Sequence, residues 1–336
     1  MRSRLLVLVT GTALIAGCMS GAARVETEAP VLDGSRVLTV NAAIAFGQGA
    51  LWTATPDMLV RIDPTTGASD PPMSIAAEGS IIAIAVGAND IWLAVYRGSL
   101  MFPDEGAVLR VDSTAQRVIA SIPVLRAPAG CGPGGLTIGE GAVWVAHCRD
   151  AMVSRIDPVT NQVTDKIRVG KNPGAIAVGE GSVWVANRYG TVSRIDPGSR
   201  QVVATIAVGS WTHGIAVGEG LVWVVRAARF GLKGTVLRID PKTNRLVGEP
   251  ISVGSSAWDV VIGEGALWVS NQNDDSVSRI DPATGRVTSF FGMACPAGLA
   301  VGGAALWVGH SSSAGPVLFP FGTFKTCSIG VTRHPL

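Results

Sequence analysis

Charged residues are scarce in this chain. Asp, Glu, Lys and Arg make up 15 % of its 336 residues, against about 25 % in an average soluble protein. The two signs nearly balance, with 27 Lys and Arg against 25 Asp and Glu. A protein that binds nucleic acid through its phosphates normally presents a strongly basic surface. The near-neutral balance therefore argues against nucleic acid as a partner.

Histidine and cysteine, which supply many catalytic and metal-binding groups, are also few. The chain has four histidines and five cysteines, and no cysteine pair has the C-x-x-C spacing of metal or redox sites. No HExxH, GxSxG, phosphate-binding loop or GxGxxG motif stands in a convincing context. We therefore expect no metal and no cofactor, and the motifs do not favour an enzyme.

The N-terminus has the order of charges and apolar residues that is typical of a secretory signal. Arg2 and Arg4 precede an apolar run from Leu5 to Ile15, which is too short to span a bilayer as a mature helix. Residues 14–18, Leu-Ile-Ala-Gly-Cys, resemble a bacterial lipobox. That resemblance implies a signal peptide at 1–17, cleavage before Cys18 and lipidation of its thiol. An ordinary signal peptide with a coincidental cysteine is the alternative.

Lipidation and export would decide where the protein resides and how its cysteines behave. Several acyl chains on one residue anchor a protein stably. We therefore expect it in the cell envelope, on the outer membrane or the outer face of the cell membrane, with residues 18–34 as lipidated cysteine and flexible tether. Disulfides persist outside the cytosol, and four cysteines allow three pairings. We favour Cys131–Cys148 and Cys295–Cys327, because each pair lies within one repeat; a reactive or metal-binding cysteine is the alternative.

Tryptophan and glycine are abundant, with 9 and 42 residues, and the tryptophans mark a repeat. Seven of them recur at intervals of 39 to 52 residues: Trp52, Trp92, Trp144, Trp184, Trp223, Trp268 and Trp307. The clearest unit contains four runs rich in Val and Ile, at 175–178, 182–186, 191–195 and 202–208. Four strands in about forty residues are typical of a β-propeller blade. We predict an all-β chain, a seven-bladed β-propeller of four-stranded antiparallel blades over residues 35–336, with a solenoid as the alternative.

The turns of the repeat fit this architecture. Gly-Glu-Gly, as at 179–181, gives the hairpin between the first and second strands residues that can take positive φ. Asp-Pro, as at 196–197, ends the third strand. The tryptophans are expected to pack one blade on the next. We expect Arg36–Val40 to close the ring against the last unit, Gly298–Phe319, with Thr326–Val331 as a competitor for the same edge.

The repeat also resembles known families. Val183–Pro197, Val-Trp-Val-Ala-Asn followed by Thr-Val-Ser-Arg-Ile-Asp-Pro, resembles the YVTN-type repeat of YncE-like propellers. It is also similar to the repeat of streptogramin (virginiamycin B) lyases, and both resemblances extend from about residue 36 to the end. The lyase resemblance implies histidines at the start of the first strand, a nearby glutamate and Mg²⁺, which together act as a carbon–oxygen lyase on a cyclic peptide antibiotic.

His213 matches one such histidine position, and a general base near neutral pH suits an elimination. The equivalent positions in the flanking blades are Gly174 and Trp258, and Arg226 stands where a carboxylate might follow the second strand. A histidine without its partners does not make that site. Magnesium is therefore expected only if the lyase alternative holds.

One rim of the predicted propeller varies from blade to blade, as binding loops on a rigid scaffold do. It holds the connections between the second and third strands and those between blades. Its candidate binding residues are His147, Asn187, Arg188, Trp211, His213, Arg226, Trp258, Asp259, Asn271 and His310. Five cations, Lys171, Arg188, Arg226, Arg229 and Lys233, stand there without an interleaved acid. They favour an anionic ligand, and solvated loop charge is the alternative.

Trp211 and Trp258 are the two tryptophans outside the repeat, and each is expected to stack on a ligand or to pack over the channel end. We therefore expect a monomeric, envelope-anchored propeller that binds a small molecule or a protein partner on this rim. The alternatives are a lyase with His213 as its catalytic residue and a structural scaffold for protein interaction.

Overall fold

The computed structural model describes residues 43–55, 58–75, 80–97, 104–127, 133–148, 150–228, 232–292, 295–310 and 330–336. The predicted signal peptide, Cys18, the tether and the strand expected at Arg36–Val40 lie outside these residues. The same holds for Cys131, Cys327 and Arg229. Within the described part, no helix has the length and apolar character needed to span a membrane.

The described strands form seven antiparallel sheets in chain order, and these are the blades. Blade 1 contains β1 (Ala43–Gly47), β2 (Ala50–Ala54), β3 (Met58–Ile62) and β4 (Met73–Ser74). Blade 2 contains β5 (Ser80–Val86), β6 (Asp90–Arg97), β7 (Asp104–Asp112) and β8 (Arg117–Ala127). Blade 3 contains β9 (Pro133–Gly139), β10 (Ala142–His147), β11 (Met152–Asp157) and β12 (Gln162–Arg168). Blade 4 contains β13 (Pro173–Gly179), β14 (Ser182–Asn187), β15 (Thr191–Asp196) and β16 (Gln201–Ala207).

The last three blades vary this plan slightly. Blade 5 contains β17 (Thr212–Gly218), β18 (Leu221–Arg226) and β19 (Lys233–Asp240), with two short strands on its outer edge, β20 (Arg245–Leu246) and β21 (Ile251–Ser255). Blade 6 contains β22 (Ala257–Gly263), β23 (Ala266–Asn271), β24 (Ser276–Ile280) and β25 (Val287–Phe291). Blade 7 contains β26 (Pro296–Val301), β27 (Ala305–His310) and β28 (Gly330–Pro335).

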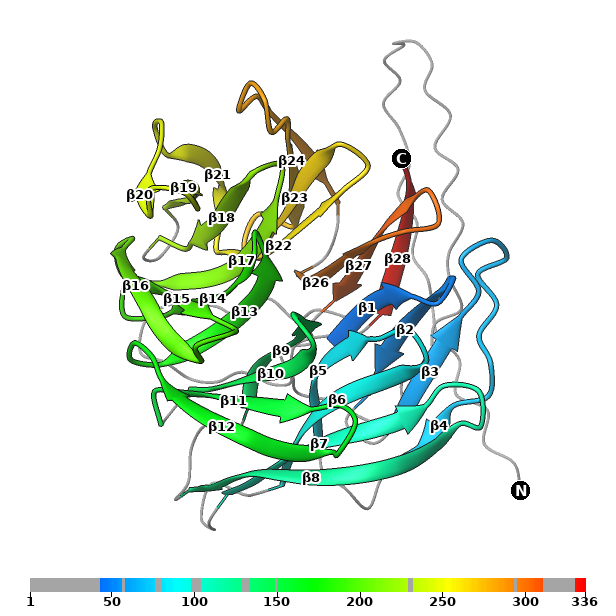
Figure 1. Cartoon of the computed structure of the whole chain (residues 1–336). Coiled ribbons are helices and arrows are strands. Elements are labelled where there is room, and N and C mark those ends of the chain that lie inside the picture. The colour runs from blue at the N-terminus through cyan, green and yellow to red at the C-terminus, as the bar shows by residue number, and fades with distance from the viewer. Residues whose placement is uncertain are drawn as a thin grey trace, which may run out of the picture.

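The seven blades close into a ring (Figure 1). The inner strands β1, β5, β9, β13, β17, β22 and β26 each contact the next, and β26 contacts β1. Trp307 of blade 7 packs with Leu51 and Phe46 of blade 1, so the closure has an apolar core. The predicted all-β, seven-bladed propeller of four-stranded antiparallel blades is confirmed.

The third strand of blade 7 differs from the expectation. We expected the strands of the last unit within Gly298–Phe319, but β28 pairs with β27 from Gly330 to Pro335. The prediction was wrong because the connection between the second and third strands is much longer in this blade than in the clear repeats. Thr326–Val331, the expected competitor for the edge, overlaps only the start of β28.

The repeat tryptophans join neighbouring blades, as predicted. Trp184 of blade 4 is fully buried and shares a cluster with Val222 and Val224 of blade 5. Its indole Nε1 donates to the carbonyl of Gly179, 3.1 Å away at the end of β13. Glu180 and Gly181 in the following turn both have positive φ, 51° and 64°, which is the requirement of a type I′ hairpin.

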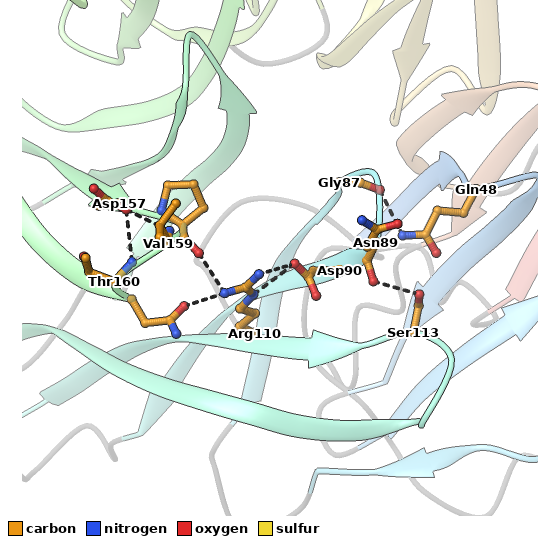
Figure 2. A network of polar contacts seen from close by, with 11 residues as sticks. Gln48, Gly87, Asn89, Asp90, Arg110, Ser113, Asp157, Val159 and Thr160 are labelled. Atoms are coloured by element: carbon orange, nitrogen blue, oxygen red, sulfur yellow. Dashed lines mark hydrogen bonds and ion pairs between the residues drawn. The ribbon is translucent and has the colours of Figure 1, made fainter.

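An arginine on the third strand links neighbouring blades on the rim that carries these turns (Figure 2). Arg110 of blade 2 pairs with Asp90, with Nη2 2.6 Å from Oδ2. Its Nη1 also donates to the carbonyl of Pro158 and to Oδ1 of Asn161, both in blade 3. Arg194 of blade 4 repeats the link to Pro241 and Asn244 of blade 5. On this rim, Arg110 and Arg194 therefore each join their blade to the next one.

Candidate functional site

The polar residues that stand three beyond the repeat tryptophans lie inside their blades. Asn187 is fully buried, and its Nδ2 donates to Thr191 Oγ1 and Ser193 Oγ at 3.1 and 3.0 Å. Asn271 makes the same two bonds, to Ser276 and Ser278. These amides hold the second strand of each blade to the third where the strands open onto the variable rim.

His147, His310 and Arg226, which stand at the same position in other blades, are also buried or hydrogen-bonded within their blades. His147 is buried and its Nε2 lies 2.8 Å from Ser154 Oγ. Burial, with a smaller effect of Lys166, lowers the pKa of His147 to about 4, so the ring is neutral at pH 7. His310 is buried at the end of β27. Arg226 is half-buried, with Nε 3.3 Å from Thr235 Oγ1.

Three other predicted residues meet on the variable rim, and they come from three consecutive blades. The ring of His213, in β17 of blade 5, lies 4.3 Å from the ring of Trp258, in β22 of blade 6. The guanidinium carbon of Arg188, in the turn after β14 of blade 4, lies 5.6 Å from the centroid of the same indole ring. We call Arg188, His213 and Trp258 the rim cluster.

Strand register explains why these side chains converge. Pro173 pairs with Asn187, Thr212 with Arg226 and Ala257 with Asn271. Gly174, His213 and Trp258 each follow the first residue of such a pair, so they occupy equivalent positions on neighbouring inner strands. At Gly174 an added Cβ would lie 3.3 Å from Arg188 Nε. The glycine thus gives Arg188 the space that a side chain fills in the next two blades.

The rim cluster is positively charged and carries unused hydrogen-bonding groups. Arg188 is exposed, and no hydrogen bond or ion pair joins its guanidinium to any described residue. Desolvation lowers the pKa of Arg188 from its ordinary value, but an arginine of this kind stays charged at pH 7. His213 Nδ1 is buried and has no partner within the described part of the chain. Burial, with a smaller effect of the Arg188 cation, lowers the pKa of His213 to about 4.

Asp259 follows Trp258, but its carboxyl group is directed to backbone amides. Oδ1 accepts from Val260 N at 2.8 Å, and Oδ2 accepts from Leu299 N of blade 7 at 3.0 Å. Enclosure of the carboxyl raises the pKa of Asp259 to about 6, against the opposing effect of these two amide bonds. Asp259 therefore joins blades 6 and 7 and does not pair with Arg188.

Trp211 stands beside the rim cluster in a backbone conformation unusual for a large residue. Its φ is 68° and it is 52 % exposed. Its N–H donates to the carbonyl of Arg188, and its own carbonyl accepts from Ala227 N, both at 2.9 Å. The residues that precede the inner strands of blades 4, 6 and 7 are Asn172, Ser256 and Cys295, also at positive φ. Smaller residues tolerate this region better than tryptophan.

The comparisons with known proteins extend to the fold but not to a function. A repeat family described as a repeat of unknown function (DUF6923) matches residues 220–312, less than half of the chain. No curated protein matches the sequence.

Several solved structures share the architecture. A chain of Kuenenia stuttgartiensis hydrazine synthase aligns with a TM-score of 0.70 at 12 % identity, over 91 % of this chain and 99 % of that one. The WD40 domain of Neurospora crassa Pan2 aligns with a TM-score of 0.63 at 13 % identity, over 82 % and 86 %. The computationally designed Ika8 protein aligns with a TM-score of 0.59 at 15 % identity, over 81 % and 82 %. At these identities the likeness concerns the fold alone.

The rim does not reproduce the constellation that the lyase resemblance implies. Glycine and tryptophan occupy the positions equivalent to His213 in the flanking blades, and the nearby carboxyl of Asp259 is held by two amides. In the described ranges, no three His, Cys, Asp or Glu side chains are grouped so that they could hold a metal ion. The residues present do not fit a magnesium site of that kind.

Some features of the site had no signal in a single repeat. The stack of Arg188 on Trp258 joins blades 4 and 6, which are not neighbours, so no pattern within one blade predicts it. Exposed Tyr189, next to Arg188, adds a further aromatic side chain to Trp211 and Trp258 on the rim. Trp211 occupies the position of Asn172 and Ser256 in the neighbouring blades, and all three residues have positive φ. The sequence around Trp211 carries no glycine or asparagine at this position that would predict such a backbone.

Proposed function

We propose that this propeller binds an anionic small molecule or protein partner on the variable rim, at the rim cluster of Arg188, His213 and Trp258. One observation carries the proposal: Arg188 is an exposed guanidinium that is held against an indole ring and has no acidic partner among the described residues. Arginine offers paired donors to carboxylate and phosphate groups. Large, rigid aromatic side chains such as Trp258 and Trp211 supply contact area at low entropic cost.

The proposal includes attachment to the cell envelope. A lipidated Cys18 would hold the propeller at a membrane surface, with residues 18–34 as a tether. Disulfides Cys131–Cys148 and Cys295–Cys327 belong to the same proposal, because an exported protein meets oxidising conditions. Labelling with a radioactive fatty acid tests the anchor: the wild-type protein should be labelled and recovered with membranes, and Cys18→Ser should be neither.

A thermal-shift screen of residues 19–336 against anions, peptides and metals tests the binding. A ligand at about 100 times its Kd should stabilise the fold by about 2.7 kcal/mol, which raises the Tm by several degrees. The stabilisation should vanish in Arg188→Glu. It should persist in Arg168→Glu, which makes the same charge change at an exposed arginine ending β12 on the same rim. Ligands that stabilise the wild type and Arg188→Glu equally would refute the proposed site.

A further inference from the structure

The exposed guanidinium of Arg188 points to a specific ligand chemistry. Its planar fork can donate two parallel N–H bonds to one carboxylate, and no described residue uses these donors. Lys171 and Lys233 are exposed elsewhere on the rim, and half-buried Arg226 bonds Thr235 Oγ1 through its Nε. None of these three cations makes a described contact with Arg188. One cation suits a ligand group that carries a single negative charge.

His213 adds a directional contact and no charge. Its Nδ1 is buried without a partner in the described chain, and a buried polar atom normally finds one. Its ring is fixed against Trp258 at 4.3 Å, so Nδ1 cannot turn freely to water. Only a polar group that enters the space beside the imidazole would give Nδ1 a partner.

The surroundings favour a flat apolar group next to the charge. Trp258 is half-buried, and its indole lies against the Arg188 guanidinium. Trp211 is exposed, and its backbone is next to that of Arg188 because its N–H donates to the Arg188 carbonyl. Trp211 has φ 68°, a backbone region that a large side chain rarely adopts and that costs stability. The equivalent residues of blades 4, 6 and 7 also have positive φ, so blade 5 differs from them by placing an exposed indole at this position.

We propose that the rim cluster is a subsite for an aryl carboxylate, in which Arg188 binds the carboxylate and the indole of Trp211 contacts the aromatic group. This inference deepens the proposed function and rests on it. The same chemistry occurs in a free aryl acid and at the C-terminus of a peptide that ends in an aromatic residue. The test therefore includes both sources.

Isothermal titration calorimetry at constant ionic strength compares matched pairs of probes. Indole-3-acetate is compared with indole-3-acetamide, and a pentapeptide ending in Phe is compared with its C-terminal amide. Phenyl phosphate provides a doubly charged alternative. We expect at least one carboxylate to bind, and its neutral amide to bind about tenfold or more weakly, because a charge-assisted pair is lost. Preference for the acid or for the peptide identifies the source.

Two conservative variants test the two contacts without unfolding the protein. Arg188→Lys retains the charge but removes the fork, and we expect it to weaken the carboxylate about tenfold. Trp211→Asn places at φ 68° the residue type found at Asn172 in blade 4, and we expect it to weaken the aryl probes about threefold to tenfold. Arg168→Lys is the matched control and should change nothing.

Three results would overturn the inference. They are equal binding of acid and amide, tighter binding of phenyl phosphate than of either carboxylate, and no carboxylate binding tighter than about 1 mM. Each leaves the proposed function standing if the thermal-shift screen still finds a ligand that depends on Arg188. Loss of every Arg188-dependent ligand refutes the proposed function itself.

Discussion

Arg188 lies over the indole of Trp258, 5.6 Å from guanidinium carbon to ring centroid, although the two residues belong to blades 4 and 6. His213, near the start of β17 in blade 5, contacts the same indole. Three blades thus contribute one side chain each to a compact cationic and aromatic group. This convergence distinguishes the sector from the opposite rim, where Arg110 and Arg194 are bonded to turns of the neighbouring blade.

The cation of Arg188 should depress the pKa of His213 in solution. Burial is the larger cause of the low value of about 4, and Arg188 adds to it. Arg188→Ala should therefore raise the pKa of His213 part of the way toward its ordinary 6.5, while Arg168→Ala leaves it unchanged. NMR titration of the histidine ring protons measures both. An unchanged pKa in Arg188→Ala would mean that the guanidinium does not lie beside His213.

His147 should make the fold less stable in mild acid. Its folded pKa of about 4 lies below the ordinary 6.5, so the unfolded chain binds a proton more readily as the pH falls between these values. Stability is therefore full above about pH 6.5 and declines toward pH 4, by at most about 3 kcal/mol for this residue.

Replacing His147 by asparagine tests this dependence without disturbing the blade. In blades 4 and 6 the residue equivalent to His147 is an asparagine, and it bonds Ser193 or Ser278. Ser154 occupies the same register position in blade 3, so an asparagine at 147 can bond it in the same way. Urea unfolding at several pH values should show a smaller loss of stability between pH 6.5 and 4 in His147→Asn. An identical pH profile would assign the dependence to other groups.

The link from Arg194 to Asn244 should stabilise the ring. Arg194 Nη1 lies 2.9 Å from Asn244 Oδ1 and also bonds the Pro241 carbonyl, and hydrogen bonds to charged groups contribute about 1.5–3 kcal/mol. Arg194→Ala should lower the free energy of unfolding by a similar amount, measured by urea denaturation. In a double-mutant cycle with Asn244→Ala the losses should be less than additive. Strict additivity would show that the two side chains do not interact.

The repeat tryptophans should matter more for stability than the rim tryptophans. Trp184 is fully buried between two blades, so Trp184→Ala should cost about 3–5 kcal/mol through the lost apolar burial and the cavity left behind. Trp211→Asn should keep or raise the stability, because it relieves the strain of a large side chain at positive φ. Calorimetric melting of both variants measures the contrast, and a large loss in Trp211→Asn would assign that residue a packing role.

The sequence predicts the scaffold well because its determinants are local and repeated. The Gly-Glu-Gly turns, the Asp-Pro stops and the buried tryptophan recur in register, so one clear blade such as 175–208 defines the others. The third strand of blade 7 was misplaced because no repeated turn precedes β28. Asn187 and Asn271 are predicted as binding residues of the rim. In the structure their side-chain amides donate to Ser193 and Ser278 on the third strand of the same blade.

The rim cluster was partly predictable. Arg188, His213 and Trp258 were recognised as unusual residues on the variable rim, because each departs from the repeat. Their contact depends on Gly174 leaving space for Arg188 and on the curvature of the ring, and neither is visible in a single blade. The attachment of Asp259 to the amide of Leu299, forty residues away, is likewise a property of the closed ring.

Hydrogen exchange of the propeller with and without a stabilising ligand tests the central claim most directly. If the variable rim of blades 4–6 is the binding face, the ligand should protect backbone amides in residues 188–190, 211–213 and 257–259. Protection confined to the opposite rim, for example at the turn of Glu180 and Gly181, would contradict the account.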